Sequence, residues 1–259
     1  MTRFSANLGF LYTEHSLPEA IRQAAKAGFD AVEMHWPYAT PAEEVKAALV
    51  ETGLPLLGIN TDRGNIDGGE NGLSALPGRE VDARAAIDQA MEYADAVGAA
   101  NVHVMAGFAS GEEAHATFVE NLRYACDRAA HHDIGILIEP LNRYDAPGYF
   151  LTTVEQGRDV LTDVGDERGK LMFDCYHMQL MGGDLTNRLT RFMPVIGHIQ
   201  FASVPDRGTP DHGEVSYAHI FAHLDAMGWD VPLGAEYKPV QPTADTLGWM
   251  GAYSSKSSE

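Results

Sequence analysis

Eight short apolar runs, each followed by a stretch with helical periodicity, constrain the fold of this chain more than any other feature of its sequence. The helical stretches carry apolar residues three and four positions apart and are rich in alanine, a strong helix former. Strands that alternate with helices in this way pair in parallel, because each helix carries the chain back across the sheet. The eight runs are FSANLGF, AVEMHW, LPLLGIN, NVHVMAG, GILIEPLN, KLMFDCYH, VIGHIQFAS and VPLGAEY.

Eight strands with seven clear crossover helices favour a closed (β/α)8 TIM barrel over an open doubly wound sheet. The chain length of 259 residues suits one barrel with one core, so we expect residues 1–259 to form a single domain. An open sheet that binds a dinucleotide would carry a glycine-rich fingerprint after its first strand, and the sequence has none there.

Two segments depart from the regular alternation. Residues 61–78, TDRGNIDGGENGLSALPG, form a glycine-rich loop after the third strand, either a lid over a site or a solvated surface loop. After the eighth strand only KPVQPTADTLGWMGAYSSKSSE follows, which leaves room for a short eighth helix at about residues 244–250. We expect residues 251–259 to be a frayed tail.

The sequence also predicts where several helices begin and end. Thr40 followed by Pro41 predicts an N-cap with proline at the first helical position. Three helices are predicted to end at a glycine in the left-handed conformation: Gly28, Gly53 and Gly98.

The charge balance narrows the choice of partners. Thirty-seven acidic and 18 basic residues give a net charge of −19, which repels phosphate backbones and anionic lipid. We therefore expect neither nucleic acid nor a membrane as partner, whereas a cation would be attracted. Two isolated cysteines, Cys126 and Cys175, do not form a disulfide framework, and no signal peptide or long apolar run is present. A cytoplasmic protein is the expectation.

Side chains that carry oxygen stand at the ends of four consecutive strands. In a parallel barrel the carboxyl ends of all strands meet at one rim, so such side chains can converge. Three carboxylates and one amide are hard donors that suit Mg²⁺ or Mn²⁺, and burying the carboxylates without a cation would be costly. One acid at a strand end is often only a solvated rim residue, but four in register predict a metal site. The four residues are Glu139, Asp174, Gln200 and Glu236.

A hard metal between two glutamates suits an isomerisation of the aldose–ketose type. The metal holds a carbonyl and its neighbouring hydroxyl and stabilises the enediolate that forms when the carbon proton leaves. Glu139 and Glu236 would be the catalytic pair, one taking the proton and the other returning it at the adjacent carbon.

Several motifs together resemble a known family. IEPLNR, MFDCYH, GHIQFASVPDRGTPDHGEV, GAEY, ANLGF and FDAVEMHWPY are similar to stretches of the hydroxypyruvate isomerase family of the xylose isomerase-like TIM barrels, and the likeness runs over nearly the whole chain. The resemblance implies a divalent-metal isomerase, an intramolecular oxidoreductase that interconverts hydroxypyruvate and 2-hydroxy-3-oxopropanoate. It also implies that Glu139 and Glu236 are the acid–base pair, and that they hold the metal together with Asp174 and Gln200.

Other activities on the same barrel stay open or are disfavoured. Close relatives of the family act on four-carbon 2-oxotetronates, and the strand-end motifs do not separate the two substrates. Ketose 3-epimerases place a histidine at Gln200 and a glutamate at Asp145, and this chain departs from both. A polyol dehydratase would share the metal and the glutamates. DNA hydrolases of this class need many histidines and a basic groove, and a non-enzymatic sugar-acid binding barrel would have lost a ligand residue.

A keto acid brings a carboxylate, which needs a cation in so acidic a site. Arg207, in the loop SVPDRGTPDHG after the seventh strand, is the first candidate, because a guanidinium binds a carboxylate through two hydrogen bonds. The alternative for this arginine is a surface pair with Asp206 or Asp211. Arg143 and Lys238 are weaker candidates for the same role.

Histidines near the strand ends complete the predicted site. His177, three residues past Asp174, can donate to a substrate oxygen as a neutral imidazole, and His212 is a second candidate for substrate binding. His198, two residues before Gln200, is expected to support it from inside the barrel. Three further residues either line the pocket or make core hydrogen bonds: His35, Asn60 and His103. The sequence leaves open the metal used in the cell and whether the chain forms a homodimer or a higher homo-oligomer.

Overall fold

Eight parallel strands pair in the order β2-β1-β8-β7-β6-β5-β4-β3 in the computed structural model, which describes residues 2–253. The two outer strands, β2 and β3, meet through a parallel bridge between Val32 and Leu56, and the Met34 N–H donates to the Gly58 carbonyl at 3.0 Å. The sheet therefore closes on itself, and the predicted (β/α)8 barrel is confirmed. The strands are β1 Phe4–Asn7, β2 Ala31–Glu33, β3 Ile59–Asn60, β4 Asn101–His103, β5 Gly135–Ile138, β6 Gly169–Asp174, β7 Ile196–Phe201 and β8 Leu233–Ala235.

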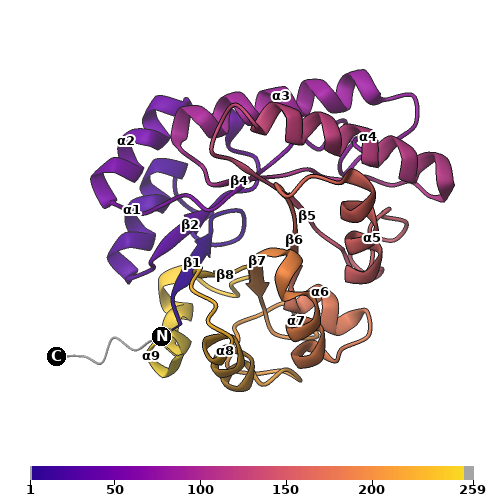
Figure 1. Ribbon diagram of the computed structural model, residues 1–259. Coiled ribbons are helices and arrows are strands. Elements are labelled where there is room, and N and C mark those ends of the chain that lie inside the picture. Colours follow the sequence, from indigo (N-terminus) through magenta and orange to yellow (C-terminus); the bar gives the residue numbers. More distant parts are fainter. Residues whose placement is uncertain (1, 254–259) are drawn as a thin grey trace.

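Helices surround the barrel and connect its strands (Figure 1). The α-helices are α1 Leu17–Ala27, α2 Ala42–Thr52, α3 Glu80–Val97, α4 Gly111–Ala129, α5 Val154–Val164, α6 Cys175–Leu180, α7 Leu185–Phe192, α8 Tyr217–Ala226 and α9 Met250–Tyr253. The 3-10 helices are η1 Pro37–Ala39, η2 Met193–Val195 and η3 Thr243–Trp249. Gly28, Gly53 and Gly98 end α1, α2 and α3 with φ of 91°, 71° and 77°, as predicted. Within residues 2–253 no helix is both long and apolar enough to cross a membrane.

Two boundaries differ from the sequence prediction. Helix α2 begins at Ala42 with Pro41 as its cap residue, so the predicted Thr40 N-cap with Pro41 inside the helix is wrong by one residue. The reason is the 3-10 helix η1, which ends directly before Thr40 and takes the Thr40 N–H in a hydrogen bond to the Pro37 carbonyl. The short eighth helix lies where expected, but it is the 3-10 helix η3 followed by α9. The predicted frayed tail of residues 251–259 is wrong at its start, because the chain is helical to Tyr253 in α9, and its remaining residues 254–259 lie outside the described residues.

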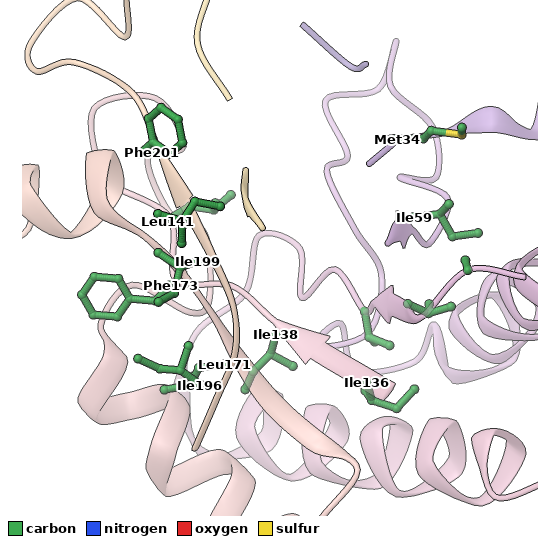
Figure 2. Close-up of a cluster of buried hydrophobic side chains, with 14 of the residues drawn as sticks. Met34, Ile59, Ile136, Ile138, Leu141, Leu171, Phe173, Ile196, Ile199 and Phe201 are labelled. Carbon is green, nitrogen blue, oxygen red and sulfur yellow. The ribbon is translucent and has the colours of Figure 1, made fainter. Parts of the chain in front are cut away.

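The strands of the second half of the barrel separate an apolar outer face from a more polar inner one. Figure 2 shows side chains of β5, β6 and β7, among them Ile138, Leu171 and Ile199, packed together under the helices. Helix α5 approaches closely, since a Cβ on Gly157 would lie 2.5 Å from a methyl of Leu171. Burying each such side chain contributes about 1.5–3 kcal/mol. Because neighbouring residues of a strand point to opposite faces, Gln200 beside Ile199 points into the barrel.

The loop of residues 61–78 is only partly a solvated surface loop. Its second part contains the buried residues Leu73 and Ala75, and the Ala75 N–H donates to the Ala106 carbonyl at 2.7 Å. Ile66 in the first part is 55% exposed. The loop is therefore anchored to the segment after β4, and its role as a lid stays a proposal.

Candidate active site at the mouth of the barrel

The four side chains that the strand-end pattern singles out are all buried at one end of the barrel. Glu139 follows β5 directly, Asp174 ends β6, Gln200 lies on β7 and Glu236 follows β8. One ligand atom from each of Glu139, Asp174, Glu236 and His177 lies within 4.8 Å of the others. Gln200 shares an enclosed cavity with Glu139 and Glu236. The structure thus brings residues that are up to 97 positions apart in the chain to one place (236 − 139).

Three of these four side chains carry an oxygen that finds no donor among the described residues. The atoms are Glu139 Oε1, Asp174 Oδ2 and Gln200 Oε1, and each is fully buried. A buried acceptor without a partner costs about 1–3 kcal/mol, and a charged one costs more. Oxygen atoms of two carboxylates and an amide, close to a third carboxylate, form the donor set that Mg²⁺ and Mn²⁺ prefer. The residues therefore fit a hard divalent cation.

The three carboxyl groups differ in their tendency to ionise. Burial, together with the charge of Glu236, raises the pKa of Glu139 well above its ordinary value. The same two causes raise the pKa of Asp174, to about 7. Burial acts in the same direction on Glu236, but Arg207 and His35 outweigh it and lower the pKa of Glu236 below its ordinary value. One glutamate of the pair therefore favours the protonated form and the other the ionised form.

Arg207 points into this site and away from the protein surface. Its Nη2 donates to Glu236 Oε2 and lies 3.7 Å from Asp174 Oδ2. The guanidinium carbon sits 4.7 Å from the ring centre of Phe10 and 4.9 Å from that of Tyr176, and the side chain is 11% exposed. The alternative, a surface ion pair with a neighbouring aspartate of the same loop, is not what the structure shows.

His177 faces the carboxylates with one nitrogen of its ring, and the partner of the other nitrogen sets its tautomer. Its Nδ1 accepts the backbone N–H of Asn142 at 3.0 Å. Because a backbone N–H can only donate, the proton of the neutral ring must be on Nε2. That Nε2 lies 3.6 Å from Asp174 Oδ2 and 3.9 Å from Glu139 Oε1. Burial and the charge of Arg207 lower the pKa of His177 to about 3, so the ring is neutral and faces the carboxylates with an N–H.

Residues at the ends of β1 and β2, the two strands next to β8 in the sheet, hold Glu236 in place. Asn7 Nδ2 donates to Glu236 Oε1 at 3.0 Å, and His35 Nε2 lies 2.9 Å from the same oxygen. His35 was expected either to line the pocket or to make a core hydrogen bond, whereas Asn7 was not predicted at the site. Asn7 is the last residue of β1, so the rule that selected the ligands of β5 to β8 would have found it.

Three of the predicted substrate-binding candidates lie outside this group. His212 has a side chain that is 48% exposed, and it bonds to Asp206 at 2.8 Å because the loop folds back on itself. Lys238 is exposed as well, and its backbone N–H, not its ammonium group, contacts Arg207. Arg143 is exposed and stacks on the neighbouring Tyr144.

A hollow of about 590 Å³ opens above the carboxylates. Its walls include Glu139, His177, Arg207 and Glu236 together with three residues that the sequence predicted to line the pocket, namely His35, Asn60 and His103. Phe10, Trp36 and Met105 add apolar surface. A hollow in which charged and polar groups converge beside apolar surface is suited to a small polar molecule.

Known proteins resemble the chain over almost its whole length. The sequence model of the xylose isomerase-like TIM barrel family matches residues 21–253. The 2-oxo-tetronate isomerase of Cupriavidus necator is 43% identical over 257 residues, 98% of this chain and 99% of that protein. The hydroxypyruvate isomerase of Escherichia coli is 40% identical over 258 residues, 98% of this chain and 100% of that protein. A crystal structure from Brucella melitensis, described as an AP endonuclease of family 2, matches with a TM-score of 0.94 and 37% identity, over 98% of this chain and 99% of that one.

Proposed function

The chain belongs to the xylose isomerase-like TIM barrel family, and from this premise we propose that it is a metal-dependent isomerase of a small 2-oxo acid. The reaction proposed is the interconversion of hydroxypyruvate and 2-hydroxy-3-oxopropanoate. The observation that carries the proposal is the set of buried, unpartnered oxygens on Glu139, Asp174 and Gln200 beside the ionised Glu236. Full-length relatives at about 40% identity that bear the names of such isomerases support it.

The metal would be held by Glu139, Asp174, Gln200 and Glu236. When bound, a Mg²⁺ or Mn²⁺ ion supplies a Lewis acid that stabilises negative charge on the substrate oxygens. Cation binding would also relieve the repulsion among the three carboxylates, which costs most when they are buried together.

The two glutamates are suited to opposite steps of one proton transfer. Glu236, with its lowered pKa, is ionised and can take the proton from the hydroxyl-bearing carbon of hydroxypyruvate. Glu139, with its raised pKa, can hold a proton and deliver it to the adjacent carbon, which was the carbonyl carbon. One proton is taken from carbon and one is returned to the adjacent carbon, while a further proton passes from the hydroxyl oxygen to the former carbonyl oxygen, and the reverse reaction exchanges the roles. His177 Nε2–H can donate to a substrate oxygen while the charge develops.

Arg207 is the proposed anchor for the substrate carboxylate. It is the cation that lines the hollow, and its buried Nε has no acceptor among the described residues. Phe10 and Tyr176 hold the guanidinium plane between them, which limits the entropy lost on binding.

A four-carbon 2-oxotetronate is the second candidate substrate, because the relative from Cupriavidus necator is named for it. The hollow opens toward solvent, and its lining does not separate the two acids. The DNA-directed activity in the description of the Brucella melitensis structure is not proposed for this chain, since a net charge of −19 opposes binding to phosphate backbones. The epimerase and dehydratase alternatives share the same glutamates and differ in their products.

Turnover of the two acids with and without metal tests this proposal. Purified protein is freed of metal with a chelator and assayed by proton NMR in heavy water against hydroxypyruvate and a 2-oxotetronate. We expect isomerisation only after Mg²⁺ or Mn²⁺ is restored, with solvent deuterium at the carbon that receives the proton. Equal turnover in the chelated protein would refute the metal site, and failure to isomerise either acid would refute the substrate class.

A further inference from the structure

A buried carboxylate inside the barrel contacts Gln200 but has no part in the proposed reaction. Glu33, the last residue of β2, is 4% exposed. Its Oε2 accepts a hydrogen bond from Gln200 Nε2 at 2.7 Å and lies 3.0 Å from His198 Nε2. The two partners are two residues apart on β7, so they point to the same side of the sheet. Glu33 therefore contacts this strand from across the barrel.

The contact matters because the two ends of a glutamine amide have the same shape and opposite hydrogen-bonding character. The oxygen end can bind a cation, whereas the NH2 end can only donate. A carboxylate is an acceptor, so it selects the orientation in which Gln200 Nε2 faces Glu33. Gln200 Oε1 is then directed away from Glu33, and it is one of the buried oxygens without a donor.

We propose that Glu33 is a positioning residue that fixes the Gln200 amide with its oxygen, and not its nitrogen, available to the metal. This inference rests on the proposed metal site. It concerns a residue that does not itself touch the metal or the substrate.

Two neighbours hold one oxygen of the Glu33 carboxylate in place, whereas its Oε1 has no donor among the described residues. Gly234 on β8 leaves room for it, since a Cβ there would lie 2.3 Å from Glu33 Oε1 and 2.8 Å from Gln200 Cγ. The N–H that His198 directs at Glu33 Oε2 requires an acceptor at that position. The three side chains thus form one hydrogen-bonded unit whose geometry is set by β2, β7 and β8.

The affinity for Mn²⁺, measured by titration calorimetry on the full chain, tests the role of Glu33 without relying on activity. Glu33→Met keeps the length of the side chain and removes the acceptor. We expect it to weaken Mn²⁺ binding by about 10- to 100-fold, the usual effect of losing a residue that orients a metal ligand. Glu33→Gln keeps a carbonyl oxygen, which the His198 N–H orients toward Gln200, so its affinity should stay within about threefold of wild type.

The same change made in a Gln200→Glu protein distinguishes an effect on the orientation of the Gln200 amide from an effect on packing. A carboxylate has two equivalent oxygens and needs no partner to orient it, so in a Gln200→Glu protein the change Glu33→Met should not weaken Mn²⁺ binding. Met172→Ala is the matched control, because Met172 lines the same cavity with an apolar side chain. It should lower the melting temperature and leave the affinity within about threefold.

The outcomes distinguish this inference from the proposed function. If the wild-type protein binds no Mn²⁺, both the metal site and the role of Glu33 are refuted. If it binds Mn²⁺ and Glu33→Met binds equally well, or if the loss is the same in both backgrounds, only the role of Glu33 is refuted. Should Glu33→Met fail to fold, Glu33→Gln decides: a folded variant with a loss of more than about tenfold contradicts the inference.

Discussion

The two halves of the barrel contribute different kinds of polar group to the site. The ligand half, strands β5 to β8, carries acceptor oxygens that are buried and in three of four residues lack a donor: Glu139, Asp174, Gln200 and Glu236. The supporting half, strands β1 to β4 and the residues that follow them, carries side chains that lie close to those residues: Asn7, Glu33, His35 and His103. Reactive atoms and the atoms that position them thus come from the two different halves of one barrel.

This division explains why the two glutamates of the site differ. Glu236 receives two hydrogen bonds from the supporting half and one from Arg207, and hydrogen bonds to the charged form favour ionisation. The supporting residue near Glu139 is His103, whose Nδ1 lies 3.9 Å away, beyond hydrogen-bond distance. Burial also lowers the pKa of His103 to about 3, so this ring brings no charge. Glu139 therefore stays the more basic of the two.

The largest expected effect comes from neutralising either glutamate of the ligand half. Glu139→Gln or Glu236→Gln should lower kcat for hydroxypyruvate by about 1,000-fold or more, because general acid–base catalysis contributes roughly that factor. Steady-state assays with circular dichroism as a folding check measure it. A variant that keeps more than about one tenth of the wild-type rate would show that the carboxylate is not a proton carrier.

The sequence predicted the residues of the ligand half better than the contacts that the supporting half makes with them. Glu139 could be predicted because its signal is local: an apolar strand ends, and Pro140 stops it. The pairing of Asn7 with Glu236 spans 229 positions, so it depends on which strands close the barrel and not on any pattern nearby. His212 was expected at the site, yet the path of the loop after β7 places it at the surface. The sequence thus predicted which polar residues stand at the strand ends, but not which of them contact one another in the barrel.

A pH series tests the ligand half, because Asp174 must lose its proton before it can bind a metal ion. The raised pKa of Asp174, about 7, means that protons compete with the cation for this carboxylate below neutral pH. Mn²⁺ affinity should therefore rise by more than about tenfold between about pH 5.5 and pH 8, as expected when metal binding releases protons. Titration calorimetry at several pH values measures this.

Protonation of Asp174 also changes the stability of the chelated protein, and the direction of this change follows from its raised pKa. A carboxyl group whose pKa is higher in the folded state stabilises that state at low pH, and this contribution is lost as the pH rises through the folded pKa, here toward about 7 for Asp174. The difference in Tm between Mn²⁺-loaded and chelated protein should therefore grow as the pH rises. Asp174→Asn should flatten the dependence, and a difference that is constant with pH would contradict the assignment.

Arg207 lies in the loop after β7 and contacts Glu236 of the ligand half. Arg207→Ala should raise the KM for hydroxypyruvate by about 10- to 100-fold, the effect of losing a charged hydrogen bond of roughly 1.5–3 kcal/mol. Lys238→Ala and Arg143→Ala are the controls, and both should leave KM within about twofold because the two side chains are exposed. An unchanged KM in Arg207→Ala, with a raised KM in one control, would move the substrate carboxylate to that residue.

Within the supporting half, a single lost hydrogen bond should have a moderate effect. Asn7→Ala removes one donor to Glu236 Oε1 and leaves His35 in place. We expect kcat to fall by about three- to tenfold with little change in KM, since one such bond contributes about 1 kcal/mol. A loss as large as that of Glu236→Gln would mean that the supporting half takes part in the reaction itself.

The smallest effect is expected at His212, which belongs to neither half. Its imidazole pairs with Asp206, which raises the pKa of His212, but the pair is exposed, and ion pairs of this kind contribute little. His212→Ala should leave kcat/KM within about twofold and Tm within about 2 °C. Assays with both acids and thermal melts measure these values. A drop of more than about fivefold in kcat/KM with an unchanged Tm would mean that the loop after β7 moves onto the substrate, and the site would then include a surface that neither half of the barrel provides.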